Sequence, residues 1–249
     1  MRTLVHARRL GVLVALCGIL TAILTPTTAH SQTRRALLIG INRYAKHPAT
    51  DRTKDLEGAV NDAQAVAQVL STYHGFQPAH VKLLLDAEAT RAGILSAIRA
   101  QLLASAQPGD LSLLFYAGHG SQVSAPDSPE PDRLDETLVP ADANSGVPDI
   151  RDKELAAVLQ EAIDKKIRLI VLIDSCHSGS LTRALPDEAR IRYAKPGRSP
   201  RSLLPTVASL PSLEERGALI FAGTQDRQAA QERLILGRPR GRFSSALEA

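Results

Sequence analysis

The stretch LSLLFY at residues 111–116 runs into Ala-Gly-His-Gly, and the stretch RLIVLI at residues 168–173 runs into Asp-Ser-Cys-His-Ser-Gly. Mostly apolar residues followed at once by small ones are typical of a buried strand of a parallel sheet that ends in a loop. The helix-like segment between the two stretches allows the right-handed crossover that makes such strands parallel neighbours. Because both loops then leave the carboxyl edge of one sheet, we expect His119 and Cys176 to meet there. A thiol nucleophile and its base have this arrangement.

Strands and helices alternate along the rest of the chain. Apolar runs predict further strands at residues 35–41, 81–85 and 218–222. Apolar residues spaced three and four apart predict helices that begin near residues 56, 90 and 152, where Thr90 and Asp152 can act as N-caps. This alternation predicts an α/β fold, with a mostly parallel central sheet and helices on both faces.

Two segments break this pattern. Residues 121–149 are polar and rich in Asp, Pro and Ser, with an apolar island at residues 137–140. Residues 182–211 carry six basic side chains and five prolines. Such a composition buries too little apolar surface to pack, so we expect residues 182–211 to form a mobile basic loop.

The N-terminal residues 1–31 are expected to be a signal peptide. A basic start precedes a charge-free apolar stretch at residues 10–24, and small residues suited to cleavage follow. This stretch is short for a membrane span, so an uncleaved anchor is the second interpretation. We therefore expect export, to the periplasm or the medium, and no stable membrane span once the signal is removed.

The cysteines point to a chemical role for one of them. Cys17 lies within the expected signal, which leaves Cys176 without a possible disulfide partner in the same chain. Exported proteins tend to use cysteines in pairs, so a single one calls for a chemical explanation. The alternative is a buried, inert thiol.

The overall charge gives no reason to expect nucleic acid as a partner. The formal net charge of +4 includes Arg2, Arg8 and Arg9 of the expected signal, so the remaining chain is close to neutral. Aromatic residues make up 3% of the chain, which leaves no platform for stacked bases.

Six segments between residues 34 and 232 together resemble one family. They are, in order, RALLIGINRY, LEGAVNDA, LLFYAGHGSQ, LDETLVPAD, VLIDSCHSGS and GALIFAGTQDRQAAQE. The chain resembles the caspase-like cysteine peptidases (peptidase family C14), and within them the bacterial metacaspase type. The resemblance implies a caspase-like α/β/α sandwich over residues 34–249. The cysteine context, Asp-Ser-Cys-His-Ser-Gly, departs from the Gln-Ala-Cys of animal caspases.

The C-terminal end departs from the family as well. In the family, a Gly-x-Phe-Thr/Ser segment like residues 241–244 opens a helix that continues further. This leaves two alternatives, a C-terminally truncated fragment or a domain without the last elements of the sheet.

The resemblance implies hydrolysis of peptide bonds by a Cys–His dyad. Cys176 would be the nucleophile, and His119 would protonate the leaving amine and later activate water. The backbone N–H groups of Gly120 and Cys176 would stabilise the oxyanion. His177 adjoins the nucleophile but points the other way in an extended chain, so we do not expect it to be the base.

The family also implies an acidic pocket for Arg or Lys before the cut bond, in protein or peptide substrates. The matching residues are Asp62 and Asp174. The alternative makes Asp62 a first-turn charge favoured by the helix dipole and Asp174 a loop cap. If the pocket interpretation holds, the basic loop at residues 182–211 is placed for self-cleavage.

The family resemblance also implies a calcium site. Asp135 and Asp152 match two of its aspartates, but Lys153 and Arg183 stand where further aspartates would be expected. Calcium requires six to eight oxygen ligands, so we expect no metal and no other cofactor.

Two other classes of function stay open at this point. The chain could be an inactive caspase-like module that binds a partner. It could also be another thiol hydrolase, or a redox thiol, on an α/β sheet.

Overall fold

The computed structural model describes six ranges of the chain: residues 31–46, 53–126, 132–176, 191–196, 212–223 and 230–247. The expected signal peptide (except Ser31), His177 and Arg183 lie outside these ranges. No helix in the described ranges is long and apolar enough to cross a membrane.

Within the described residues, the central sheet contains five parallel strands in the order β2-β1-β3-β7-β8. They are β1 (Arg34–Gly40), β2 (Val81–Leu85), β3 (Leu111–Ala117), β7 (Arg168–Asp174) and β8 (Leu219–Ala222). The predicted parallel sheet is therefore confirmed. Gly40, Ala117 and Asp174 are aligned across β1, β3 and β7, so the loops that follow these strands start at the same edge.

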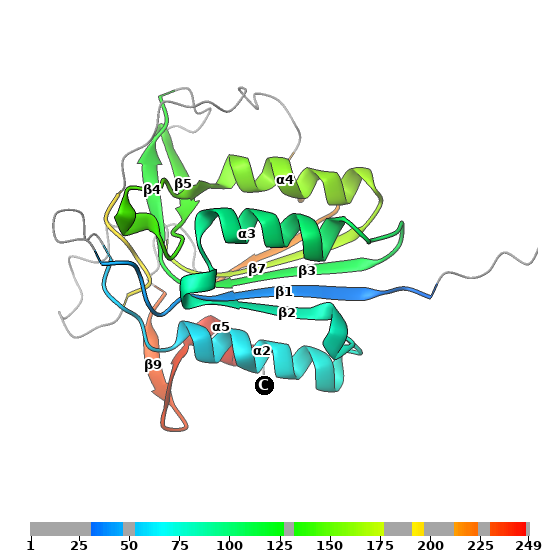
Figure 1. Ribbon diagram of the computed structural model, residues 1–249, viewed down its shortest axis with the longest axis horizontal. Coiled ribbons are helices and arrows are strands. Elements are labelled where there is room, and N and C mark those ends of the chain that lie inside the picture. The colour runs from blue at the N-terminus through cyan, green and yellow to red at the C-terminus, as the bar shows by residue number, and fades with distance from the viewer. Residues whose placement is uncertain are drawn as a thin grey trace, which may run out of the picture. The chain divides into compact units, whose positions relative to one another are not determined.

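Helices cover both faces of this sheet (Figure 1). α3 (Arg91–Ala97), its π-helical continuation (Ile98–Leu103) and α4 (Asp152–Asp164) lie on one face, and α2 (Ala59–Tyr73) and α5 (Arg242–Ala246) lie on the other. Successive side chains of a strand point to opposite faces. In β3, Leu114 and Tyr116 accordingly join the apolar cluster under α3 and α4, whereas Phe115 packs in the cluster under α2. The described residues from Arg34 onward thus form an α/β/α sandwich, as expected.

One predicted helix cap is confirmed and the other is wrong. The Thr90 hydroxyl oxygen accepts a hydrogen bond from the Gly93 N–H at 3.0 Å at the start of α3. Asp152 is instead the first residue of α4, and Arg151 is its N-cap. The reason is that β6 (Ile150–Arg151) runs directly into the helix, so the extended residue at the boundary is Arg151.

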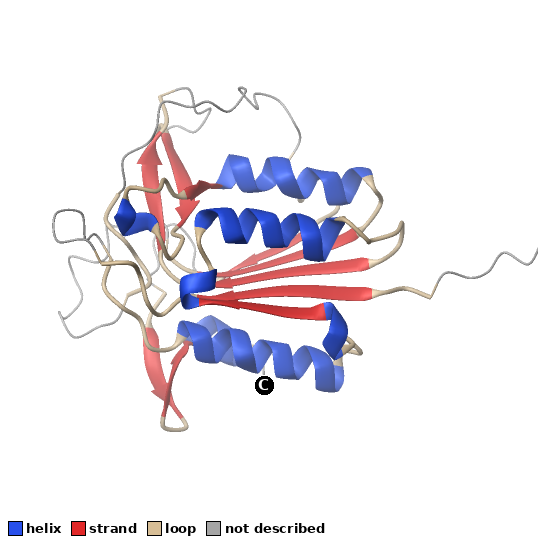
Figure 2. Cartoon of the chain, in the orientation of Figure 1, coloured by secondary structure: helices blue, strands red, loops and turns tan. Residues whose placement is uncertain are grey.

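The polar segment 121–149 contains strands that the sequence analysis did not predict. β4 (Gly120–Ser124), β5 (Leu134–Leu138) and β6 form a small antiparallel sheet, drawn in red beside the central sheet in Figure 2. β9 (Glu232–Ile235) and β10 (Arg238–Gly241) pair as a second antiparallel unit. Both units lie at the carboxyl edge of the central sheet (Figure 1).

Candidate active site

His119 lies in the short link between β3 and β4 and is almost fully buried. Its backbone is held by two tyrosines: the His119 N–H donates to Tyr44 Oη at 2.8 Å, and Tyr116 Oη donates to the His119 carbonyl at 2.6 Å. Burial raises the pKa of both phenols, so they stay neutral and keep these hydrogen bonds. Neither tyrosine was identified from the sequence.

The imidazole of His119 is oriented by a backbone carbonyl. Its Nε2 lies 2.6 Å from the carbonyl oxygen of Lys54. Because a carbonyl oxygen can only accept, Nε2 carries the proton in this contact, and Nδ1 is the nitrogen that can take up another. The Tyr44 ring packs against the imidazole with 4.9 Å between centroids.

Cys176 lies two residues beyond the end of β7 and is fully buried. Its Sγ accepts a hydrogen bond from the Ala230 N–H at 2.5 Å. The backbone N–H groups of Cys176 and Gly120 both donate to the carbonyl oxygen of Arg192, each at 3.0 Å. The structure thus brings together the two N–H groups that the sequence analysis assigned to an oxyanion.

The chain around Arg192 crosses the carboxyl edge as an extended segment, hydrogen-bonded on both sides. The Arg192 N–H donates to the Ala230 carbonyl at 3.0 Å, and the Ala194 N–H donates to the Gly120 carbonyl at 2.9 Å. Residues 191–196 belong to the segment that is expected from the sequence to be a mobile basic loop. Their backbone groups have hydrogen-bond partners on both sides. The rest of that segment, residues 182–190 and 197–211, lies outside the described residues.

The guanidinium of Arg192 is fully buried among carboxylates. Its Nη2 lies 2.5 Å from Asp62 Oδ2 and 3.1 Å from Glu232 Oε1, and its Nη1 lies 3.0 Å from Asp174 Oδ2. The two aspartates that the sequence analysis assigned to a pocket are therefore neighbours, although they are far apart in sequence. Glu232 was missed, because nothing in its local sequence marks it as a pocket residue.

Each of these carboxylates is held by a second partner. Arg240 Nε donates to Asp62 Oδ1 at 2.5 Å, Ser244 Oγ donates to Asp174 Oδ2 at 2.5 Å, and the Gly58 N–H donates to Glu232 Oε1 at 2.8 Å. Such second contacts fix the positions of the oxygens that face the guanidinium.

The charges in the pocket favour a cation. Burial alone would lower the pKa of Arg192, but Asp174, Asp62 and Glu232 outweigh it and raise the pKa above its usual value. Burial raises the pKa of Asp62, against the opposing effect of Arg192. A group of buried carboxylates without a cation would be costly, and the guanidinium of Arg192 supplies that cation here.

Gly241 leaves room for this pair of charges. A Cβ atom at Gly241 would lie 2.3 Å from Asp174 Oδ2 and 2.7 Å from Arg192 Nη1. The Gly241 N–H also donates to Asp62 Oδ2 at 2.9 Å. The backbone at this glycine therefore packs directly against the ion pair of Arg192 and Asp174.

The calcium candidates do not fit a calcium site. Asp135 is fully buried and forms ion pairs with Arg151 and Lys153, and Asp152 Oδ2 lies 3.4 Å from Lys153 Nζ. Although burial opposes it, hydrogen bonds from Lys153 and Arg151 hold the pKa of Asp135 below its usual value. In the described ranges, no group of three or more His, Cys, Asp or Glu side chains could hold a metal. Cations of the protein already bind the carboxylate that calcium would need.

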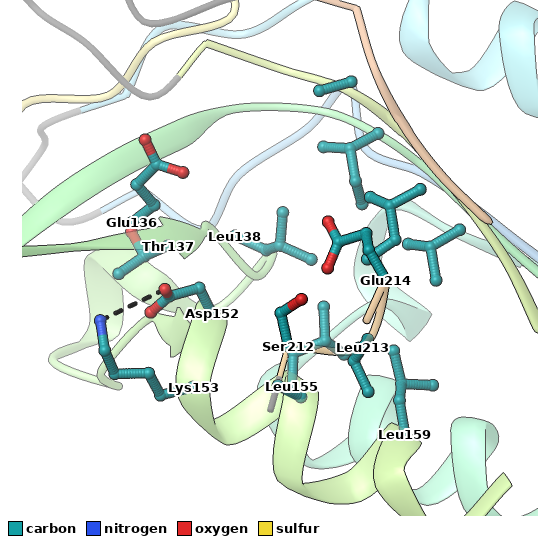
Figure 3. A pocket seen from close by; sticks show the side chains of 15 residues that line it. Glu136, Thr137, Leu138, Asp152, Lys153, Leu155, Leu159, Ser212, Leu213 and Glu214 are labelled. Carbon is teal, nitrogen blue, oxygen red and sulfur yellow. Dashed lines mark hydrogen bonds and ion pairs between the residues drawn. The ribbon is translucent and has the colours of Figure 1, made fainter. Parts of the chain in front are cut away.

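An apolar cavity of about 380 Å³ lies elsewhere, between α4 and the sheet. Figure 3 shows side chains that line it, among them Leu155 and Leu159 of α4 and the ion-paired Asp152 and Lys153. Its lining contains none of the residues that contact Arg192. Of the predicted site residues that the structure describes, Asp152 is the one that lines this cavity.

Comparisons with known proteins show which family the chain is similar to. The profile of the metacaspase peptidase C14 domain matches residues 34–185. Metacaspase-1 of Eremothecium gossypii is 35% identical over 153 residues, which are 59% of this chain and 32% of that protein. Metacaspase III c of Phaeodactylum tricornutum is 33% identical over 159 residues, which are 61% of this chain and 45% of that protein. The chain spans about a third of the length of the metacaspase-1 relatives.

A solved structure supports the same fold. Protein GSU0716 from Geobacter sulfurreducens matches with a TM-score of 0.63 and 27% identity, over 86% of this chain and 80% of that chain. The segment matched by the family profile includes β1 to β7 and contains both His119 and Cys176. The chain therefore belongs to the metacaspase family of C14 peptidases.

Proposed function

We propose that the protein is a cysteine endopeptidase that cuts protein or peptide chains after arginine or lysine. One observation carries this proposal: Arg192 lies as a substrate residue would, with its guanidinium among three carboxylates and its carbonyl oxygen at two N–H groups. Membership of a cysteine peptidase family supports the reaction class. The pocket supports the choice of a basic residue.

In this proposal His119 Nδ1 takes the proton of the Cys176 thiol, and the thiolate attacks the carbonyl carbon of the basic residue. The N–H groups of Gly120 and Cys176 stabilise the negative oxygen that forms. His119 gives a proton to the leaving amine, which departs with the C-terminal part of the substrate. An acyl-enzyme remains, and a water molecule that His119 deprotonates hydrolyses it. The contact of Nε2 with the Lys54 carbonyl keeps Nδ1 as the nitrogen for these proton transfers.

We also propose that the bond between Arg192 and Tyr193 is cut by the protein itself. The Arg192 carbonyl already accepts hydrogen bonds from Gly120 and Cys176, and this bond is the one that follows the residue in the acidic pocket. The basic loop is then the first substrate of the enzyme. Its Arg192 side chain must also leave the pocket before another substrate can bind there.

The test compares peptides that differ in the residue before the cut bond. Peptides with Arg or Lys are expected to have kcat/KM values more than about a hundredfold above those with Asp, because Asp would place like charge among buried carboxylates. Asp62→Asn and Asp174→Asn should lower the rate on basic peptides, whereas Asp164→Asn on the surface of α4 should not. Their thiols should still react with a small alkylating agent.

Other outcomes favour the other classes of function. A preference for Asp overturns the pocket. No hydrolysis of any peptide, with a thiol that still reacts with alkylating agents, favours an inactive binding module or a redox thiol.

A further inference from the structure

We propose that Ser121 and the start of β4 bind the two substrate residues that follow the cut bond. The inference rests on the proposed function, and it concerns a part of the substrate that the acidic pocket does not touch. Ser121 would bind substrates that extend at least two residues beyond the cut bond.

The bound segment supplies the contacts on this side. Ser121 Oγ donates to the carbonyl oxygen of Ala194 at 2.9 Å, and both residues are fully buried. Ala194 is the second residue after Arg192, whose carbonyl oxygen lies at the Gly120 and Cys176 N–H groups. The contact is therefore made by the second residue after the bond that would be cut.

Gly120 forms hydrogen bonds with residues on both sides of that bond. Its N–H donates to the Arg192 carbonyl, and its own carbonyl accepts the Ala194 N–H at 2.9 Å. Gly120 and Tyr193 form a parallel β-bridge. With the Ser121 hydroxyl, three hydrogen bonds in sequence join the segment to β4, as in the addition of a strand to a sheet edge.

These contacts involve backbone groups of the bound segment. The Ser121 hydroxyl donates to the backbone carbonyl of the second residue after the cut. Any amino acid at that position provides this carbonyl, whereas a substrate that ends before it does not. The serine is held in place because β4 pairs with β5, where Ser121 is opposite Thr137. Such a site selects for chain length rather than for a particular residue, which suits an endopeptidase.

The timing of the reaction makes the proposal testable. The residues after the cut leave with the amine, so they contact the enzyme during acylation and not during hydrolysis of the acyl-enzyme. Ser121→Ala should therefore lower kcat/KM for substrates that extend past the cut. It should not affect a substrate in which a coumarin amide directly follows the arginine.

The experiment uses three substrates with the same sequence up to Arg. The first ends in a coumarin amide, the second continues as Tyr-Ala-amide, and the third continues as Tyr-ethylamide, which keeps the N–H but lacks the carbonyl that Ser121 would bind. In the wild-type protein the second should be cut about three- to tenfold more efficiently than the third, the worth of one hydrogen bond between neutral groups. In Ser121→Ala the second and third should be cut equally well.

The matched control is Ser124→Ala, an exposed serine on the same strand, which should retain the wild-type preference. A Ser121→Ala protein that keeps the preference for Tyr-Ala-amide overturns this inference alone. An equal loss on all three substrates, coumarin amide included, also overturns it, because the serine would then support the fold and not the substrate. If the wild-type protein cuts none of the three, the proposed function fails and this inference fails with it.

Discussion

Arg192 is the residue around which the site is built. Its planar guanidinium presents several N–H groups in fixed directions, which matches carboxylates placed on different sides of it. Asp62 comes from α2, Asp174 from the end of β7 and Glu232 from β9. Removal of the arginine would leave these carboxylates buried with Arg240 as the nearby cation. The pocket without Arg192 is thus expected to bind another basic side chain.

The third carboxylate gives a prediction that the sequence could not. Glu232→Gln removes one charge from the pocket and keeps the shape of the side chain. We expect kcat/KM for arginyl peptides to fall by about ten- to a hundredfold, since a hydrogen bond to a charged group contributes about 1.5–3 kcal/mol. Steady-state kinetics would check this, with Glu161→Gln on the surface of α4 as the control. An unchanged rate would mean that Glu232 only supports the start of α2.

The proposed dyad gives a second prediction at this scale. Cys176→Ala and His119→Ala should each abolish hydrolysis of a peptidyl-Arg substrate, and Cys176→Ser should fail too because an alcohol is a weaker nucleophile than a thiolate. Circular dichroism should remain that of the wild type, because both residues lie on loops beyond the strand ends. Turnover near the wild-type rate in any of the three would remove that residue from the mechanism.

At the scale of elements, cationic side chains of β6 and α4 bind the carboxylate of β5 that the family resemblance assigns to calcium. Asp135 of β5 binds Arg151 of β6 and Lys153 of α4. We propose that the protein needs no calcium, because the ammonium and guanidinium groups already neutralise this carboxylate. The family resemblance identified Lys153 as a departure, but it did not identify Arg151.

A calcium titration tests this proposal. Activity on a peptidyl-Arg substrate should be the same with a calcium chelator as with millimolar calcium. Lys153→Asp should lower activity, because it exchanges the ammonium group for a second carboxylate beside Asp135, and added calcium should restore part of it. Loss of wild-type activity with the chelator, and its return with calcium, would contradict the proposal.

The elements also show why some structure could be predicted and some could not. Apolar runs predicted β1, β3 and β7, because buried parallel strands need apolar side chains on both faces. Similar runs predicted the outer strands β2 and β8, although these are more exposed in the structure. β4 and β5 were missed because they place polar Ser121 and Thr137 in buried positions, where hydrogen bonds satisfy them. Charge pairs such as Arg192 with Asp62 join residues distant in sequence, and no local pattern reports such a contact.

At the scale of the whole molecule, one edge of the sheet collects groups from most of the chain. His119 follows β3, Cys176 follows β7 and Asp62 lies near the start of α2, whose N-terminus faces the same edge. The parallel topology makes this possible, because it brings the loops after neighbouring strands to one side. The same topology is the basis for predicting from the sequence that His119 and Cys176 lie at one edge, and β3 and β7, the strands that precede them, are indeed parallel neighbours.

The most direct measurement is the intact mass of the purified protein after incubation. If Arg192 is bound as a substrate, the wild-type chain should give two fragments, one ending in Arg192 and one beginning with Tyr193. Cys176→Ala should stay uncut because it lacks the nucleophile, and Arg192→Gln should stay uncut at this bond because it lacks the charge that the pocket binds. A cut that persists in Cys176→Ala, or an uncut wild-type chain that hydrolyses peptidyl-Arg substrates at full rate, would contradict the account.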